Sequence, residues 1–188
     1  MTLVTSAVIF AARAHDGATR RGGRVPYIVH PMEVAAIAAS LSGDGEVIAA
    51  AALHDVMEDC AVSREELVAA FGERVAALVE SQTQTQGGDP RESWLPRKRE
   101  AVEKLARGGR EERVLALSDK LSNMRAIRRD YAHLGERLFD RFHVRDKGLH
   151  AWYYRACADL IGQELSDTDA HRELVSLIDE VFGASGEI

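Results

Sequence analysis

The stretch 47–53 constrains the fold more than any other part of the chain. Its seven residues are all apolar, so a helix formed there has no face suited to water and has to be buried. Asp44 can cap the start of this helix, which we expect to continue through His54 and Asp55. Other helices must enclose it, and 188 residues suffice for one domain with such a core and a cleft for a small ligand.

Polar side chains crowd the far end of this expected helix. Glu58 follows His54 by one turn and Asp59 follows Asp55 by one turn, so the four side chains lie on neighbouring faces. Ionised groups left unpaired in a core would cost several kcal/mol, whereas one divalent cation satisfies an imidazole and a carboxylate together. A helix end exposed to water is the ordinary alternative for a lone His-Asp pair, but the repeated spacing favours a metal site.

The rest of the chain also follows helical periodicity, and the alternating β-branched and aromatic runs that mark strands are missing. The predicted fold class is all-α, one bundle of about eight to ten helices covering the whole chain. A capping box at Ser63 and Glu66 opens a short helix that Gly72 ends. The other helices are expected at about 2–15, 31–41, 44–55, from 73, 97–107, 110–131, 147–165 and 168–182. The segment 82–96 is predicted to be a loop near the site.

Charge and cysteine usage narrow the possible partners. With 30 acidic and 24 basic residues, the formal charge of −6 argues against polymeric nucleic acid or an anionic membrane surface as the partner. A small anion held by a local basic cluster fits better, and a homo-oligomer stays possible. Cys60 and Cys157 are far apart, which suggests neither a disulfide framework nor a thiolate zinc site and fits a reducing cytoplasm. No apolar run approaches the ~18 residues of a membrane span.

Four short motifs occur in a fixed order: AHDG at 14–17, PYIVHP at 26–31, HDVMED at 54–59 and SDKLSNMR at 118–125. Together they resemble the hydrolase domain of RelA/SpoT-type alarmone enzymes, a branch of the HD superfamily. The likeness extends over residues 5–160 and is greatest to the small stand-alone hydrolases of that group.

The resemblance implies a set of roles for the site. One divalent ion, usually Mn²⁺ in that family, would be bound by His30, His54, Asp55 and Asp119. Two imidazoles and two carboxylates suit such a borderline-hard ion and leave room for water. Glu58 and Asp59 match the catalytic acidic pair, which orients the attacking water, takes its proton or protonates the leaving group.

Further residues match substrate contacts of the family. Arg20 aligns with an arginine that contacts substrate, Arg21 stands where lysine is usual, and Asn123 resembles a nucleotide-contacting asparagine. Tyr153 matches a substrate-contacting tyrosine, although ordinary burial would use the same residue type, and Trp152 is expected in the core. Where the relatives have Thr-Lys, this chain has Thr83-Gln84, so we expect one basic group fewer near the site.

The favoured function is hydrolysis of the 3′-pyrophosphate of guanosine tetra- or pentaphosphate, (p)ppGpp, which releases pyrophosphate and GDP or GTP and ends a stringent-response signal. No stretch of the sequence suggests a synthetase domain. Two alternatives stay open: an HD phosphatase acting on another phosphorylated nucleotide such as NADPH, and a non-catalytic nucleotide-sensing domain. The intact set of ligands and acids speaks against the last.

Overall fold

The computed structural model describes residues 1–20, 23–84, 89 and 91–184. Within these ranges the chain forms ten α-helices and one 3-10 helix, and no strand occurs there. This confirms the all-α fold class. Among the described residues, no helix is both long and apolar enough to cross a membrane.

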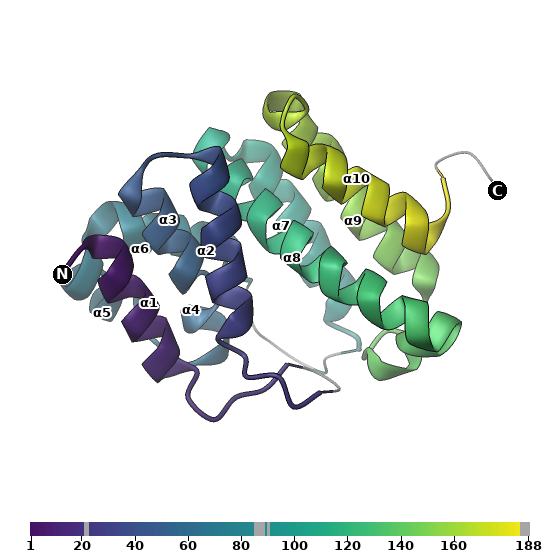
Figure 1. The fold of residues 1–188 in the computed structure, drawn as a ribbon, viewed down its shortest axis with the longest axis horizontal. Helices are drawn as coiled ribbons and strands as arrows, with labels where there is room; N and C mark the ends of the chain where they lie inside the picture. The colour runs from purple at the N-terminus through teal and green to yellow at the C-terminus, as the bar shows by residue number, and fades with distance from the viewer. Residues whose placement is uncertain (21–22, 85–88, 90, 185–188) are drawn as a thin grey trace.

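The central helix is α3, Gly45–Leu53, as its apolar sequence requires. Six of its residues are buried, and the side chain of Asp44 caps its first turn by accepting from the backbone N–H of Glu46. Four successive alanines keep the helix thin, which lets its neighbours approach closely. These neighbours are α1 (Leu3–Ala14), α2 (Val29–Leu41), α6 (Glu73–Gln82) and α8 (Arg110–Leu134) (Figure 1).

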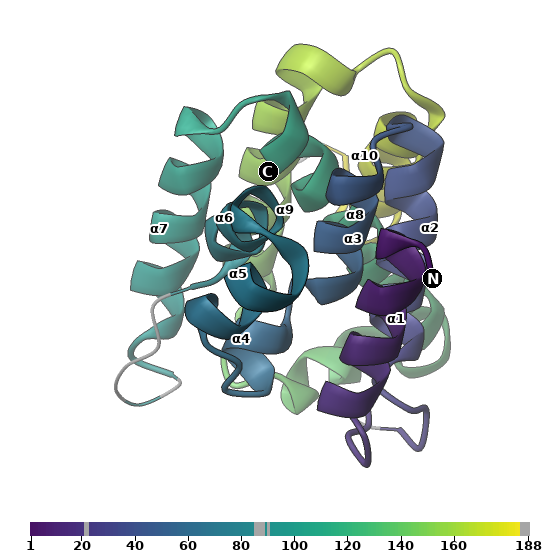
Figure 2. The ribbon, with the colours of Figure 1, turned by 90° about the vertical axis from the view of Figure 1, so that its left-hand side faces the viewer.

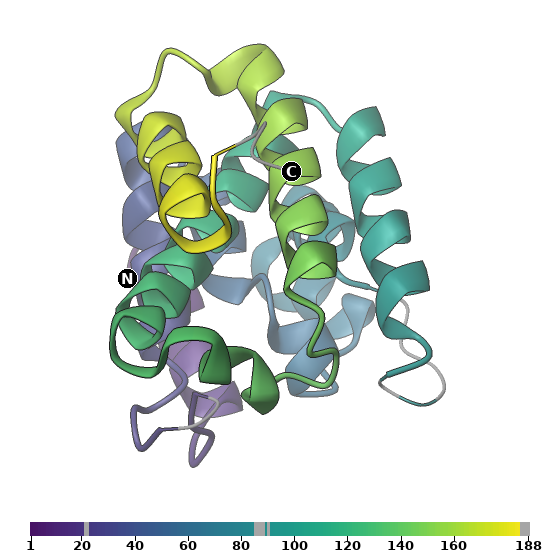
Figure 3. The same ribbon diagram turned by 90° about the vertical axis from the view of Figure 1, so that its right-hand side faces the viewer.

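The long helix α8 joins the two halves of the molecule. It packs against α2 and α3 on one side and against α9 (Lys147–Leu165) and α10 (Asp169–Phe182) on the other. Figure 3 shows α9 and α10 beside it, with the 3-10 helix η1 (Gly135–Arg141) turning away from its C-terminal end. The helix α7 (Trp94–Arg107) lies at the outer edge of the molecule and packs mainly against α9 (Figure 2).

Two short helices follow the end of α3. The first, α4, covers only Val56–Asp59, and the second, α5, covers Arg64–Phe71. The capping box predicted at the start of α5 is confirmed: the hydroxyl of Ser63 accepts from the backbone N–H of Glu66, whose carboxylate accepts from that of Ser63.

Several boundaries differ from the sequence-based expectations. The helix α3 ends at Leu53 instead of continuing through Asp55, and α7 begins at Trp94 although the loop was expected to last to Pro96. Pro96 is tolerated because it lies in the first turn, where backbone N–H groups have no partner within the helix. Trp152 was expected in the core but is 38% exposed, because α9 turns its neighbours Tyr153 and Tyr154 inward instead.

Candidate metal centre and its cleft

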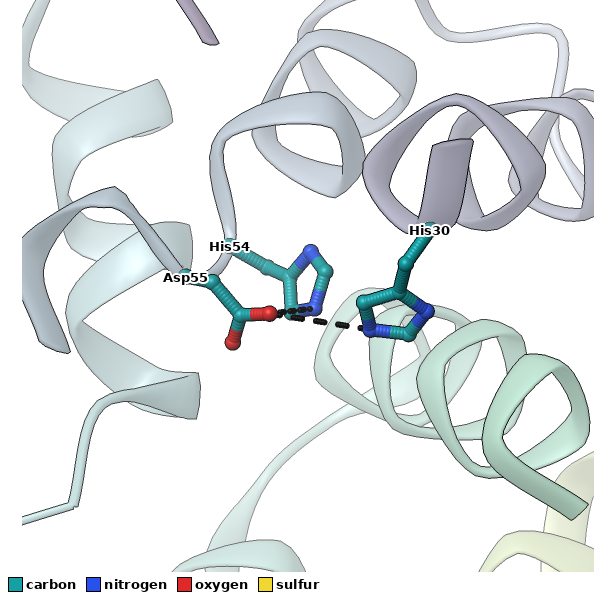
Figure 4. Close-up of side chains that lie close together, drawn as sticks. All are labelled: His30, His54 and Asp55. Carbon is teal, nitrogen blue, oxygen red and sulfur yellow. Dashed lines mark ion pairs between the residues drawn. The ribbon is translucent and has the colours of Figure 1, made fainter. Parts of the chain in front are cut away.

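Two imidazoles and a carboxylate converge where α2 meets the end of α3. The Nε2 atoms of His30 and His54 lie 3.6 and 3.0 Å from the same oxygen, Oδ2 of Asp55 (Figure 4). Among the described residues, these three form the only group of His, Cys, Asp or Glu ligand atoms that lie within 4.8 Å of one another. Both histidines are buried, so the three groups meet inside the protein.

His54 and Asp55 lie in the turn between α3 and α4. Both residues keep right-handed helical backbone angles there, although α3 itself ends at Leu53. The carboxylate of Asp55 lies 3.0 Å from the His54 ring. The expected continuous helix was therefore wrong, although the residues that it grouped do meet.

Asp119 brings the fourth predicted ligand from α8. Its Oδ1 lies 3.3 Å from Nε2 of His30 and 3.7 Å from Nε2 of His54. Asn123, one turn later, donates its amide N–H to the same oxygen at 2.5 Å, and Lys120 forms an ion pair with Oδ2. All four predicted metal ligands thus lie together.

The nitrogens of His54 show that this group is suited to a cation. Its Nδ1 lies 2.9 Å from the carbonyl oxygen of Ala51, which can only accept, so Nδ1 carries a proton and Nε2 is the nitrogen at which a second proton or a metal ion can bind. That Nε2 is buried and makes no hydrogen bond of good geometry, although Oδ2 of Asp55 lies 3.0 Å away. A divalent ion would satisfy this orphaned nitrogen together with the carboxylates around it.

The buried imidazole of His54 and the carboxylate of Asp55 shift each other's pKa strongly. Burial by itself would lower the pKa of His54, but the carboxylates of Asp55 and Asp119 outweigh it and raise this pKa to about 9. Burial would raise the pKa of Asp55, but the His54 imidazolium outweighs it and lowers this pKa to about 2. A proton on His54 therefore occupies the place that a metal cation would compete for.

The convergent group opens into a cleft of about 670 Å³ that is also lined by the predicted acidic pair, Glu58 and Asp59. Burial, and to a smaller extent Asp55, raise the pKa of Glu58, whose carboxylate accepts from the backbone N–H of Gln84 at 3.3 Å. The hydroxyl of Tyr27, which the sequence reasoning had not singled out, donates to Asp55 at 2.6 Å.

Two of the predicted substrate-binding residues contact each other. The guanidinium of Arg20 donates to the amide oxygen of Asn123 at 2.9 Å and lies 5.8 Å from the centre of the Tyr27 ring. Both Arg20 and Asn123 line the cleft. Arg21 lies outside the described residues. Tyr153 also lines the cleft, but the residue is only 4% exposed.

Lys98 on α7 is a cleft residue that sequence reasoning missed. Its ammonium donates to the side-chain oxygen of Gln84 at 3.1 Å and lies 4.7 Å from the centre of the Tyr153 ring. Burial, and then the nearby Lys120, lower the pKa of Lys98 to about 8. The site was expected to lack a basic group where Gln84 replaces lysine, yet Lys98 brings one to that place. No motif marks Lys98, because it lies outside all four.

Comparisons with known proteins agree with this architecture. A family model described as HD domain matches residues 7–146. The chain is 31% identical over 196 residues to a protein of Synechocystis named probable guanosine-3′,5′-bis(diphosphate) 3′-pyrophosphohydrolase, which covers 96% of this chain and 24% of that protein. A Vibrio cholerae protein named guanosine-3′,5′-bis(diphosphate) 3′-pyrophosphohydrolase is 51% identical over 72 residues, or 38% of this chain and 10% of its own length. The chain thus spans about a quarter or less of the curated relatives.

Two solved structures have the same fold. A Listeria monocytogenes protein is 26% identical with a TM-score of 0.73, and the match covers 82% of this chain and 99% of that one. A metazoan ortholog of SpoT, described as hydrolyzing ppGpp, is 24% identical with a TM-score of 0.77, and the match covers 98% of each chain.

The purified protein is expected to hold about one divalent ion per chain, and His54→Ala and Asp119→Ala should each lose most of it, because each removes a ligand. His133→Ala, an exposed histidine on α8, makes the same chemical change away from the site and should keep the ion. Elemental analysis by mass spectrometry measures the metal content. Equal content in all these proteins would contradict the assignment.

Proposed function

The chain belongs to the HD domain family, and on that premise we propose that it is a metal-dependent 3′-pyrophosphohydrolase of (p)ppGpp. The observation that carries the proposal is the convergence of four buried or half-buried ligand groups in a cleft that is also lined by an acidic pair and by basic side chains. The names of the relatives supply the substrate class. Such an activity would remove a stringent-response signal in the cytoplasm.

We assign the ion to four residues, His30, His54, Asp55 and Asp119. A divalent ion such as Mn²⁺ bound there would supply Lewis-acid chemistry toward a phosphoryl oxygen and toward water. The protein's own acids then move protons. Glu58, whose pKa burial raises, can hold a proton closer to neutral pH than an ordinary glutamate and exchange it with water or the leaving group. Asp59, beside it in the same cleft, is the second candidate for that work.

The substrate's phosphates would meet a set of fixed cations. Arg20 is held by Asn123 and by the Tyr27 ring, so its planar fork is already oriented toward the cleft and little side-chain freedom is lost on binding. Lys98 adds a second cation. Lys120 is paired with Asp119 and contributes mainly by orienting that carboxylate.

The metal-loaded protein should release pyrophosphate from guanosine 3′,5′-bis(diphosphate), and little orthophosphate from NADPH or GTP. Product identity is measured by coupled assays and by chromatography of the nucleotides, with His54→Ala as the metal-poor control. If the protein released orthophosphate from NADPH and no pyrophosphate from the guanosine nucleotide, the proposed substrate would be wrong and the HD phosphatase alternative would take its place. Turnover of no nucleotide would favour the non-catalytic sensing domain.

Glu58→Gln should lower kcat by roughly 10²–10⁴-fold, the range for a lost general acid or base, because the amide keeps the size of the side chain but cannot titrate. Metal content should stay unchanged, since Glu58 is not among the four assigned ligands. Single-turnover hydrolysis and metal analysis on the same samples separate the two effects. If activity and metal fell together, Glu58 would be a ligand instead.

The pKa of Lys98 predicts a pH dependence of substrate binding. With a pKa of about 8, Lys98 is charged below pH 8 and neutral above it, so its attraction for phosphate is lost as the pH rises. The KM of the wild type should therefore increase between pH 7 and 9. In Lys98→Arg, whose guanidinium stays charged, the increase should be smaller. The ratio of the two KM values isolates this residue from other titrations, and a constant ratio across that range would contradict its role.

A further inference from the structure

The hydroxyl of Ser122 lies behind the metal-facing edge of His30. Ser122 is on α8, between Asp119 and Asn123 in sequence, and is only 2% exposed. Its Oγ lies 2.8 Å from Nδ1 of His30 and donates to the carboxylate of Glu33, also at 2.8 Å. A buried hydroxyl thus connects an assigned metal ligand to an acid on α2.

The direction of these two hydrogen bonds follows from donor and acceptor counts. A hydroxyl has one proton, and a carboxylate can only accept, so the proton of Ser122 points to Glu33. The hydroxyl oxygen must then accept from His30, which requires the proton on Nδ1. The lone pair of His30 is thereby left on Nε2, the nitrogen that faces Asp55 and Asp119.

We propose that Ser122 and Glu33 are positioning residues that keep the Nε2 lone pair of His30 turned toward the metal. The inference rests on the proposed metal assignment. It adds a chain of two hydrogen bonds, from His30 to Ser122 and from Ser122 to Glu33, which we call the relay and which the four sequence motifs do not reveal. Hydrogen bonds to the far nitrogen of a ligating histidine fix the ring's orientation and tautomer, and losing them typically weakens metal binding by about 10–100-fold.

Glu33 itself is held in place by a cation. Arg125 of α8 donates to the second oxygen of Glu33 at 3.0 Å. It also forms a bidentate pair with Glu173 of α10, at 2.7 Å for both contacts. Because the guanidinium can only donate, it keeps the carboxylate oriented as the acceptor that Ser122 needs. The relay therefore extends from α2 through α8 to the C-terminal helix.

The chain provides a matched control for Ser122. Ser118 lies one turn earlier on α8, is fully buried, and donates to the backbone carbonyl of Val114 at 2.7 Å. Replacing either serine with alanine removes one buried hydroxyl from the same helix. Only at Ser122 does that hydroxyl contact an assigned metal ligand.

The test is the dissociation constant of Mn²⁺, measured by competition with a fluorescent chelator, alongside the melting temperature of each metal-free protein. Ser122→Ala should raise the constant by about 10–100-fold, and Ser118→Ala by no more than about twofold. In zinc-loaded protein with ¹⁵N-labelled histidine, the Nδ1 proton of His30 should exchange slowly in wild type and Ser118→Ala, and rapidly in Ser122→Ala. Equal constants for the two serine variants would overturn the relay.

A double-mutant cycle tests whether Ser122 and Glu33 act through one chain. Glu33→Ala should weaken Mn²⁺ binding, and adding it to Ser122→Ala should cause little further loss, because the first change already breaks the connection. Additive losses would mean that the two residues act separately and would overturn the relay. If the wild type bound no Mn²⁺, the metal assignment itself would fail. If the wild type bound Mn²⁺ and the Ser122→Ala variant bound it equally well, only the role of Ser122 would fail.

Discussion

Everything in the site depends on burying a helix that has no polar face. Because α3 is enclosed by α1, α2, α6 and α8, its C-terminal end delivers His54 into the interior beside the start of α2 and the middle of α8. Those two neighbours carry His30 and Asp119. The packing that buries six apolar residues of α3 therefore also gathers the polar ones. The interior charges that result need compensation from one another or from a cation.

Acidic and basic side chains are distributed unevenly along the cleft, so one end attracts a cation and the other attracts an anion. Around Asp55 and Asp119, carboxylates raise the pKa of His54 and create a place for positive charge. Beside Tyr153, the ammonium group of Lys98 lies 4.7 Å from the ring and favours anions, whereas that of Lys120, at 5.6 Å, is paired with Asp119. A cleft that attracts a cation at one end and phosphate at the other suits a metal-assisted reaction on a phosphate ester.

Features that depend on neighbouring residues in the sequence could be predicted, whereas features that depend on contacts between distant segments could not. Helix periodicity and capping residues act locally, so the start of α5 and the whole of α9 were predicted correctly, and the motifs grouped all four residues that converge in the structure. The break before Asp55 was missed because nothing local forbids a helix there. Lys98 and the Ser122–Glu33 contact were missed because they join segments far apart in the chain, and spacing carries no information about such pairs.

The two histidines are oriented by different means, and this difference has consequences for how the site tolerates substitution. The Nδ1 proton of His54 is fixed by a backbone carbonyl, which every residue at position 51 would supply as long as α3 keeps its path. The Nδ1 proton of His30 depends on the hydroxyl of Ser122 and the carboxylate of Glu33, and a single substitution can remove either of them. On the proposed assignment, substitutions outside the ligand set would leave the tautomer of His54 in place. They would change the metal affinity of His30, through α8 and as far away as Glu173 on α10.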